Sequence, residues 1–406
     1  MVVGSKFGAD MFVKELSVVV DRSSWGSKPI PLSLSGAPPT HNMDVKKALV
    51  MLGTLTLPSL ISPASPARLW AWLRYFLALA GDGDFRITRD FSELDPHQKG
   101  ILSDDLGVAI STQWLFDCLG GFKDIVDGRR FMLQFPHLLR KKKATTAKVG
   151  PSKAPDYVVL DHAGKWHVLE CKGTQSGIRS RDKFLRDALA QKQVILINGA
   201  IRGERLAAGL SISNEDQNRD SELRVVDPGA DPVLALDSSR EAEMQLMVHR
   251  LAVARALGVI GLSDAAMEVS LPANVLEAGR YLKPVERRRA RAKTEDRAGR
   301  AADELRSREL PQMEFRHRSY EGRTAAVELP ELGRTSPFNS IVVRQGVSAD
   351  LLQELASVSS LFGDDVDDRI DKRLSNSSVS IDSDDERTTL TYGDMLFSEI
   401  ILKRGD

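Results

Sequence analysis

The sequence predicts an α/β protein, and three observations favour this class. Residues 155–173 read as a β-hairpin, because two β-branched or aromatic runs flank a turn that contains Gly164. Segments with helix start and stop signals precede and follow this hairpin. Residues 194–201 and 223–226 are apolar runs typical of buried strands. With 406 residues, the chain is long enough for two or three domains.

The composition indicates the cellular compartment of the protein and the kinds of partner it can bind. Lys and Arg total 56, as do Asp and Glu, so a nucleic-acid-binding protein of this composition must separate its charges by region. The two cysteines, Cys118 and Cys171, form no metal-binding or disulfide pattern, which favours a reducing, cytoplasmic location. The apolar run 48–61 is short and contains Pro58, and the run 69–80 contains Arg74. We therefore expect neither a signal peptide nor a membrane partner.

Residues 1–95 are expected to form a mostly helical N-terminal region. Helices are predicted at 43–52 and 66–80, with one strand at 18–20. Trp70 and Trp72 belong to the second of these helices, and they fit either core packing or base stacking.

The helix before the hairpin is predicted over residues 103–119. Ser103 is a suitable N-cap, and acidic residues occupy the first turn. Gly120 and Gly121 follow the last turn of the helix. A first core strand is expected at 131–135, before a basic loop. The next helix, at about 180–193, follows the hairpin.

The hairpin gathers charged side chains at one end. Because side chains alternate along a strand, Trp166, Val168, Glu170 and Lys172 share one face. The antiparallel return brings Asp156, at the start of the first strand, close to the same end. Two carboxylates and one ammonium group are therefore expected to meet there. His162 and His167 fall on turn and opposite-face positions, and we do not assign them as ligands.

These residues resemble a known signature. Pro155 and Asp156, followed by Glu170, Cys171 and Lys172, are similar to the PD-(D/E)xK motif of the restriction-endonuclease-like phosphodiesterases. The resemblance covers about residues 100–230. It implies a three-layer α/β/α core with a mixed sheet, which the order helix, strand, hairpin, helix, strand fits. An incidental Glu–Lys pair on a surface hairpin is the alternative.

The resemblance also implies roles for individual residues. Asp156, Glu170 and the backbone carbonyl of Cys171 would hold Mg²⁺ or Mn²⁺, and Lys172 would orient a water molecule and offset charge on the phosphorus. Asp105, with Asp104 next, is the candidate for a further acid on the preceding helix, although both also suit the helix dipole. Gln175 and Gln191 are further catalytic candidates; the RecB-like branch has a glutamine on the following helix, but Ile195 stands where that branch has a tyrosine.

A basic surface is expected beside this site. The residues assigned to nucleic-acid binding are Arg140, Lys141, Lys142, Lys143 and Lys148 in the basic loop, with Arg179 and Arg181 after the hairpin. Phosphate contacts dominate non-specific affinity for nucleic acids, whereas a solvated loop is the alternative reading of the basic run.

The C-terminal half divides into two expected regions. Residues 231–330 form a helical, basic accessory region, with helices at 238–257 and 285–310; the arginine-rich part of the second fits a nucleic-acid contact or a solvated linker. Residues 331–406 include a strand at 340–344, a helix at 349–361 and an Asp- and Ser-rich segment, 363–387, that is expected to be flexible. The flanking regions as a whole are thus expected to be mostly helical around a core at 96–230.

Together these features predict a metal-dependent endonuclease that hydrolyses DNA. Restriction or antiviral defence is the setting that the resemblance suggests, with a homodimer or a partner protein of a defence system as further partners. The alternatives are a non-catalytic nucleic-acid-binding scaffold with the same fold and an RNA-processing endonuclease.

Overall fold

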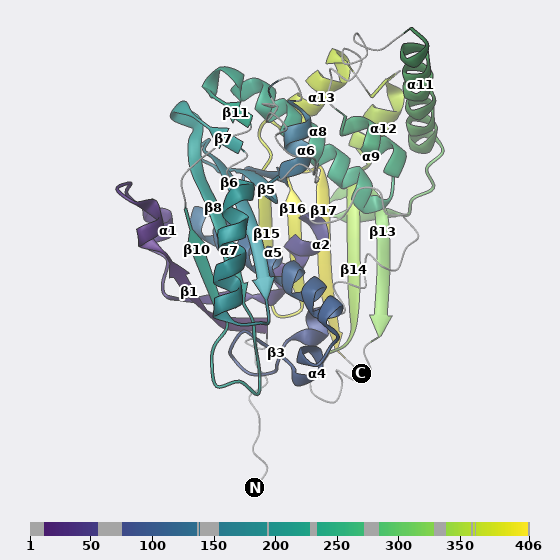
Figure 1. The fold of residues 1–406 in the computed structure, drawn as a ribbon. Coiled ribbons are helices and arrows are strands. Elements are labelled where there is room, and N and C mark those ends of the chain that lie inside the picture. The colour runs from purple at the N-terminus through teal and green to yellow at the C-terminus, as the bar shows by residue number, and fades with distance from the viewer. Residues whose placement is uncertain are drawn as a thin grey trace.

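Two large β-sheets, with helices between and around them, dominate the part of the chain that the structure describes (Figure 1). The computed structural model describes residues 12–55, 75–135, 138, 154–192, 195–227, 234–271, 284–328, 338–358, 360–361 and 363–404. Within these ranges, no helix combines the length and the apolar character that crossing a bilayer requires.

The first sheet has seven strands and contains the predicted hairpin. Its order is β2-β1-β10-β8-β6-β5-β4. The pairs β1/β10 and β6/β8 are parallel and the other pairs are antiparallel, so the sheet is mixed and the predicted α/β class is confirmed. The strands are β1 (Val13–Val20), β2 (Thr40–Asp44), β4 (Asp124–Asp127), β5 (Tyr157–Leu160), β6 (Trp166–Thr174), β8 (Arg202–Ser211) and β10 (Glu222–Val226).

The N-terminal region contributes to this sheet directly. β1 pairs with β10 and β2 pairs with β1, so residues 13–44 belong to the same sheet as the hairpin. The helix expected at 43–52 is present as α2 (Val45–Leu55). Trp70 and Trp72 lie outside the described residues.

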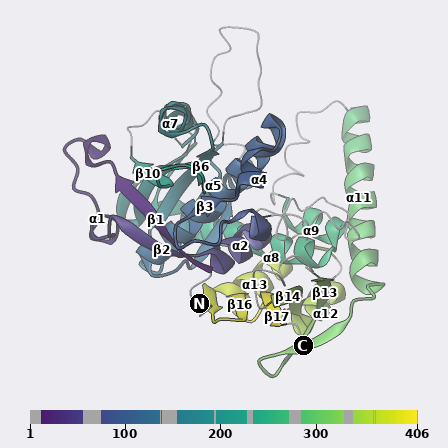
Figure 2. The ribbon, with the colours of Figure 1, turned by 90° about the horizontal axis from the view of Figure 1, so that it is seen from below.

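Two helices cover opposite faces of the first sheet (Figure 2). α5 (Pro96–Leu119) packs Leu106 and Ile110 into the apolar core that contains Leu169 of β6. α7 (Ile178–Lys192) packs Leu185 against Ala207 of β8 on the other face. The sheet therefore lies between helical layers, as a three-layer core requires.

The start of α5 differs from the prediction. The helix begins at Pro96, because the Asp95 side chain caps it by accepting hydrogen bonds from the backbone N–H groups of His97 and Gln98. Ser103 is an interior residue whose hydroxyl donates to the carbonyl of Lys99. The predicted end is confirmed: Gly120 has a φ of 69°, in the left-handed region that favours glycine.

The strand predicted at 131–135 is wrong, whereas the buried strand predicted in the run 194–201 is present but pairs outside the main sheet. Residues 128–133 form the helix α6 (Gly128–Leu133), capped by Asp127, and the strand of this region is β4, which precedes it. The run at 194–201 contributes β7 (Ile195–Ile197), which pairs with β11 (Leu234–Leu236) outside the seven-stranded sheet. The sheet instead gains β8, a strand that the sequence analysis missed.

The C-terminal part forms a second, six-stranded antiparallel sheet, so the expectation of mostly helical flanks is wrong there. Its order is β12-β13-β14-β17-β16-β15. The strands are β12 (Gln312–Phe315), β13 (Arg318–Glu328), β14 (Phe338–Ser348), β15 (Val379–Ser383), β16 (Arg387–Tyr392) and β17 (Leu396–Arg404).

The Asp- and Ser-rich segment is ordered, contrary to the prediction. It forms α13 (Asp364–Leu374) and then β15. Val366, Ile370 and Leu374 recur every four residues and are buried, so an apolar stripe holds this acidic helix on the protein. The abundance of acidic residues concealed that stripe.

Helices lie between the two sheets and join them. α2 packs on α5 and also on β16, and α8 (Glu241–Ile260) packs on β4 and on β14. Figure 2 shows these helices between the first sheet and the second. The remaining elements are α1 (Leu32–Ser35), α4 (Arg89–Ser92), α9 (Ser263–Val269), α11 (Pro284–Arg306), α12 (Ala349–Ser357), the pair β3 (Arg86–Ile87) and β9 (Ser213–Asn214), and the 3-10 turns η2 (Arg22–Trp25), η3 (Gly199–Ile201) and η4 (Ser238–Arg240).

Candidate active site

The β5–β6 hairpin is built as its sequence predicts. Tyr157 pairs with Leu169 and Leu160 pairs with Trp166. In the turn, the Asp161 side chain accepts a hydrogen bond from the backbone N–H of Lys165 at 2.7 Å, and Gly164 has a φ of 74°. These contacts fix the register of the two strands, and the register decides which side chains meet at the other end.

His167 strengthens the hairpin and is not a candidate ligand. Its Nδ1 accepts a hydrogen bond from the backbone N–H of Glu204 at 3.0 Å, and its Nε2 lies 3.1 Å from the Asp161 carboxylate. Because Nδ1 accepts, the proton of a neutral ring lies on Nε2 and is donated to Asp161. Both ring nitrogens therefore have partners, one in the hairpin turn and one in the neighbouring strand β8.

Asp156, Glu170 and Lys172 meet at the open end of the hairpin. One step beyond the Tyr157–Leu169 pair, Asp156 lies opposite Glu170, and residues opposite each other in an antiparallel pair share a face. The Asp156 carboxylate accepts a hydrogen bond from the Cys171 backbone N–H at 2.7 Å. Lys172 Nζ lies 2.5 Å from Glu170 Oε1. The three charged groups that the sequence singled out are thus brought together.

The strand faces are those that the alternation predicts. Trp166 and Val168 belong to one apolar cluster, whereas Leu169 and Cys171 belong to another on the opposite face. The Cys171 thiol is buried in that second cluster, and burial raises its pKa. Any contribution of Cys171 to the site therefore comes from its backbone.

Glu170 is a buried carboxyl group whose negative charge is only partly compensated by nearby positive charge. Its side chain has no exposed surface. Apart from the ion pair with Lys172, neither carboxylate oxygen has a hydrogen-bond partner among the described residues. Burial, and then the negative charge of Asp156, raise the pKa of Glu170 to about 8, although Lys172 opposes the rise.

The same burial and neighbouring charges shift the pKa values of Asp156 and Lys172. Burial raises the pKa of Asp156, against the opposing effects of Lys172 and the Cys171 N–H. Burial disfavours the charged form of Lys172, but Glu170 and Asp156 outweigh it, and the pKa of Lys172 is raised. Lys172 is therefore a charged donor at neutral pH, suited to stabilising an anion rather than to accepting a proton.

The acid that α5 presents to this site is Asp104, not Asp105. Burial raises the pKa of Asp104 and the charge of Lys172 opposes it, while Asp104 in turn acts on Asp156. The Asp105 carboxylate accepts a hydrogen bond from the Tyr75 hydroxyl and takes part in packing. Adjacent helical residues point about 100° apart, so the helix can direct only one of the two acids toward β6.

A pair of glycines allows α5 to approach the site closely. A Cβ atom on Gly173 would lie 1.7 Å from the carbonyl oxygen of Ser103, and one on Gly107 would lie 2.7 Å from the backbone nitrogen of Gly173. Side chains at either position would push α5 away from β6. The absence of Cβ atoms is what lets Asp104 interact with Lys172.

A cavity of about 550 Å³ lies beside the charged cluster, between α5 and α7, and we call it the α5–α7 pocket. It is lined by Asp104 and by the residues that follow Lys172 in β6. Gln175, a predicted site residue, lines it and donates a hydrogen bond from Nε2 to the Ser103 hydroxyl at 3.3 Å. Other lining residues are Lys99, Phe184, Asn214 and Gln217.

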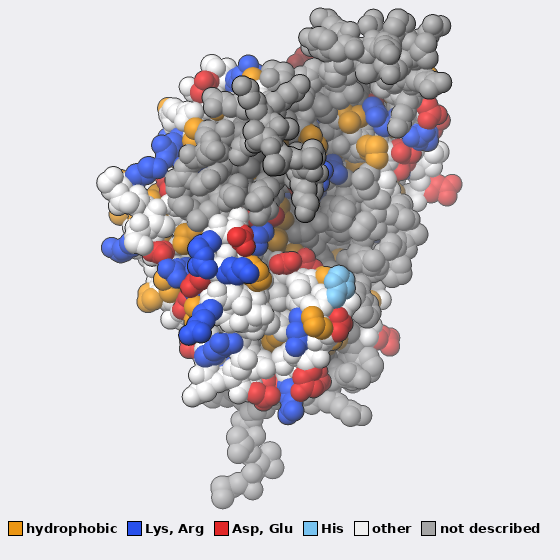
Figure 3. Space-filling model, viewed as in Figure 1, with side chains coloured by type: hydrophobic (Ala, Val, Ile, Leu, Met, Phe, Trp, Pro, Cys, Tyr) orange, Lys and Arg blue, Asp and Glu red, His pale blue; other side chains and the backbone are white. Residues whose placement is uncertain are grey.

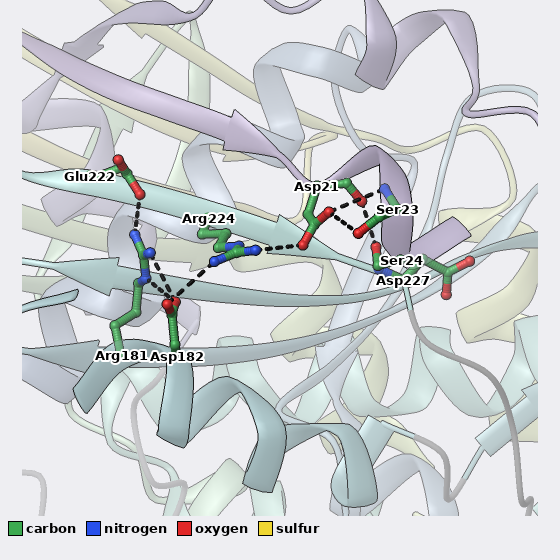
Figure 4. Close-up of polar contacts among 8 residues, drawn as sticks. All are labelled: Asp21, Ser23, Ser24, Arg181, Asp182, Glu222, Arg224 and Asp227. Atoms are coloured by element: carbon green, nitrogen blue, oxygen red, sulfur yellow. Dashed lines mark hydrogen bonds and ion pairs between the residues drawn. The ribbon is translucent and has the colours of Figure 1, made fainter. Parts of the chain in front are cut away.

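One predicted nucleic-acid contact is wrong. Arg181 is buried, with 2% of its side chain exposed. Its guanidinium group donates to Asp182 at 2.9 Å and also to Glu222, within a chain of ion pairs that continues through Arg224 to Asp21 (Figure 4). Its charge is neutralised inside the protein, where it ties α7 to β10, so it is not offered to a polyanion.

Most of the other predicted site residues have no described side chain. Arg140, Lys141, Lys142, Lys143 and Lys148 lie outside the described residues, and Gln191 lies in α7 at a position whose side chain is not described. Arg179 is exposed, in the first turn of α7. The roles assigned to these residues remain predictions.

A basic stripe on α7 joins the predicted Arg179 to Lys183 and Arg186, which the sequence analysis missed. Arg179, Lys183 and Arg186 are spaced by four and then three residues, which puts them on one side of a helix, and all three are exposed. None of them forms an ion pair with a described residue. Figure 3 shows Lys and Arg side chains gathered over the face that carries α7. The spacing of the three cations was the available signal.

The two carboxylates Asp156 and Glu170 supply some of the oxygen ligands that a hard divalent cation requires. Within the described ranges there is no group of three or more His, Cys, Asp and Glu side chains that could hold a metal. Two carboxylates nevertheless suffice for Mg²⁺, which keeps several waters and shares phosphate oxygens. The buried, unsatisfied oxygens of Glu170 fit such an ion, because a nearby cation would stabilise the ionised carboxylate.

Comparisons with protein-family models, with characterised proteins and with solved structures returned no match for this chain.

Proposed function

We propose that this protein is a metal-dependent nuclease that hydrolyses phosphodiester bonds, with DNA as the substrate and a restriction-endonuclease-like core. The observation that supports this most is the convergence of Asp156, Glu170 and Lys172 at the end of one hairpin, with Asp104 beside them. Nuclease chemistry explains why a buried carboxyl group should be kept there with no partner besides Lys172 among the described residues.

The chain's own residues have separable tasks. Asp156 and Glu170 would hold Mg²⁺ or Mn²⁺, with the Cys171 carbonyl as a further oxygen donor. When bound, such an ion polarises the phosphoryl group and lowers the pKa of a coordinated water. The Cys171 N–H holds the Asp156 carboxylate in place. Lys172, which keeps its proton, donates to the oxygens that gain charge as the phosphorus becomes five-coordinate.

Surroundings of the cluster fit a polyanionic substrate. The cations of α7 are exposed and not neutralised by described residues, and Lys99 lines the pocket. Phosphate contacts of this kind supply sequence-independent affinity that falls as salt concentration rises. An endonuclease of a defence system would use this arrangement, with a second copy or a partner protein added to cut two strands.

The direct test is cleavage of supercoiled plasmid by purified protein with Mg²⁺, with Mn²⁺ and with chelator. Asp156→Asn and Lys172→Ala should each lower the cleavage rate by about a hundredfold or more, because each removes a charge from the reacting centre. Both variants should still bind DNA. Metal-independent binding without cleavage in the wild type would instead identify a non-catalytic scaffold.

A matched pair of substitutions tests the geometry. Asp104→Asn should reduce cleavage by about tenfold, because it removes a charge that acts on Lys172 and Asp156. Asp105→Asn makes the same chemical change one residue away and should mainly lower stability, because a neutral amide oxygen is a weaker acceptor for the Tyr75 hydroxyl than a carboxylate. Equal losses of cleavage at unchanged stability would contradict this assignment. The same plasmid sequence supplied as labelled RNA decides between DNA and RNA.

A further inference from the structure

We propose that the α5–α7 pocket binds one unpaired nucleobase beside the phosphate that is cleaved, so that the substrate is single-stranded or locally unpaired nucleic acid. The location of the scissile phosphate rests on the proposed function. The pocket and its chemistry do not, and base binding can be measured without cleavage.

The position of the pocket supports this inference. Its wall includes Gly173, Thr174, Gln175 and Ser176, which follow Lys172 without interruption, and Asp104, whose charge acts on Lys172. A nucleic-acid strand whose phosphate lies at the charged cluster therefore has its neighbouring nucleotide at the pocket mouth.

The lining of the pocket is suited to a base rather than to a phosphate. Three amide side chains contribute, from Gln175, Asn214 and Gln217, and each amide carries both donors and acceptors. Ile87 and Ile212 add apolar surface. Enzymes that take a base out of its stack read it by hydrogen bonds to its pairing edge and by contact with apolar and aromatic side chains. A volume of about 550 Å³ is also in the range of small-ligand pockets.

Phe184 is the aromatic element of this pocket. It lies on α7, lines the pocket, and remains 39% exposed, which is unusual for so large an apolar side chain. Beside it in the sequence stands Lys183, part of the basic stripe. A cationic track combined with an aromatic platform is how proteins bind single strands without reading their sequence.

Cations also border the pocket on its other side. Arg219 packs so closely on Gly177 that a Cβ there would lie 2.9 Å from its guanidinium nitrogen, and it donates a hydrogen bond to Gln217 at 3.1 Å. Lys99 stands on the α5 wall. The pocket thus has positive charge near its rim, as a base with phosphates on either side requires.

The experiment measures binding by fluorescence anisotropy in chelator, so that cleavage plays no part. The probes are a labelled oligothymidine strand, the same strand paired with oligoadenine, and an abasic strand of equal length. The variants are Phe184→Ala and, as the matched control, Ile178→Ala, which removes a side chain of 41% exposure from the same helix outside the pocket. Thermal unfolding of both variants confirms that they are folded.

We expect the single strand to bind at least about tenfold more tightly than the duplex. Phe184→Ala should weaken single-strand binding by roughly tenfold and leave binding of the abasic strand nearly unchanged, because stacking on a base is what it removes. Ile178→Ala should change either by less than about twofold. Tighter binding of the duplex, or equal effects of the two substitutions, would overturn the inference.

The outcomes also separate the pocket from the nuclease. Base-dependent binding through Phe184 without any metal-dependent cleavage would refute the proposed enzyme and leave the pocket assigned. Cleavage of duplex plasmid that depends on Lys172 but not on Phe184 would support the proposed nuclease and refute the base-binding pocket.

Discussion

Glu170 is the residue whose surroundings conflict most with its chemistry. It is a carboxyl group with no exposed surface, next to a second carboxyl group and with one cationic partner. Its pKa of about 8 means that the folded protein retains a proton that the unfolded chain releases near its ordinary value of 4.5. Ionising Glu170 in the folded protein therefore lowers stability.

The expected consequence is a pH-dependent gain from Glu170→Gln. Between about pH 4.5 and pH 8 the native state binds the extra proton, so the free energy of unfolding of the wild type falls as pH rises through this window. Glutamine does not titrate. Relative to wild type, the variant should gain on the order of 3 kcal/mol between the acidic and the alkaline end of that window. Urea unfolding across it, in chelator, measures the difference.

Two controls accompany this measurement. Glu309→Gln alters an exposed glutamate and should reproduce the wild-type pH dependence. Millimolar Mg²⁺ should stabilise the wild type at alkaline pH and leave Glu170→Gln nearly unaffected, because an ion that binds only the native state shifts unfolding by mass action. Parallel wild-type and Glu170→Gln curves would show that Glu170 does not retain its proton.

The sequence identified the charged cluster of Asp156, Glu170 and Lys172, but it did not identify which helix residues lie beside it. Strand alternation places Glu170 and Lys172 on one face whatever the rest of the fold, so they could be predicted together with Asp156. The choice between Asp104 and Asp105 depends on the rotation of α5 about its axis, and short-range patterns do not supply that. Arg181 was misassigned for the same reason, since α7 turns it toward Glu222 and the sheet.

At the scale of elements, the site depends on how closely α5 approaches β6. Gly107 and Gly173 form the point of contact between the two, and backbone rather than flexible side chains stands opposite each. The sequence predicted α5 and its C-terminal glycine, but its start lies earlier because Asp95 and Pro96 form a stronger cap than Ser103. A helix end is decided by competition between caps, which a single favourable residue does not reveal.

Gly107→Ala tests this contact. The added methyl group would meet the Lys172 and Gly173 backbone, so we expect a loss of about 1 to 3 kcal/mol in the free energy of unfolding. It should also reduce cleavage, by displacing Asp104 from Lys172. Gly100→Ala is the matched control on the same helix: nothing lies within 4 Å of its new methyl group, and it should stabilise the protein by about 0.5 to 1 kcal/mol. Denaturant unfolding and the plasmid assay report the two effects.

β8 shows why one central strand was missed. Its sequence, RGERLAAGLS, begins with charged residues and continues with alanine and glycine, which are poor strand formers in isolation. The structure explains the small residues: a Cβ on Gly209 would lie 2.8 Å from Leu185, so close packing of α7 requires glycine there. Tertiary packing selected residues that local propensity disfavours.

At the scale of the whole molecule, the two sheets share one apolar core. Core residues run from Phe12 to Leu402 and include both β6 and the C-terminal strands. Local sequence patterns do not reveal this sharing, because the packing of the helices on a second sheet involves contacts between distant parts of the sequence. A polar contact also joins the halves: the Tyr392 hydroxyl donates to the buried carboxylate of Asp124.

The shared core should make unfolding a single cooperative transition. All five tryptophans precede residue 167 in the sequence, whereas the strands of the six-stranded sheet begin at Gln312 and Tyr392 belongs to β16. Tyr392→Phe leaves the buried Asp124 without this donor and should lower the free energy of unfolding by about 1 to 3 kcal/mol. If the halves unfold together, tryptophan fluorescence and far-ultraviolet circular dichroism must shift by the same amount.

A second tyrosine in the same sheet provides the control. Tyr320 of β13 packs its ring on Phe397, and because Tyr320→Phe keeps this ring contact, it should shift both signals less than Tyr392→Phe does. A tryptophan transition that stays fixed in Tyr392→Phe while the dichroism signal shifts would mean that the sheets unfold independently. In that case the C-terminal sheet could be removed without loss of the hairpin cluster.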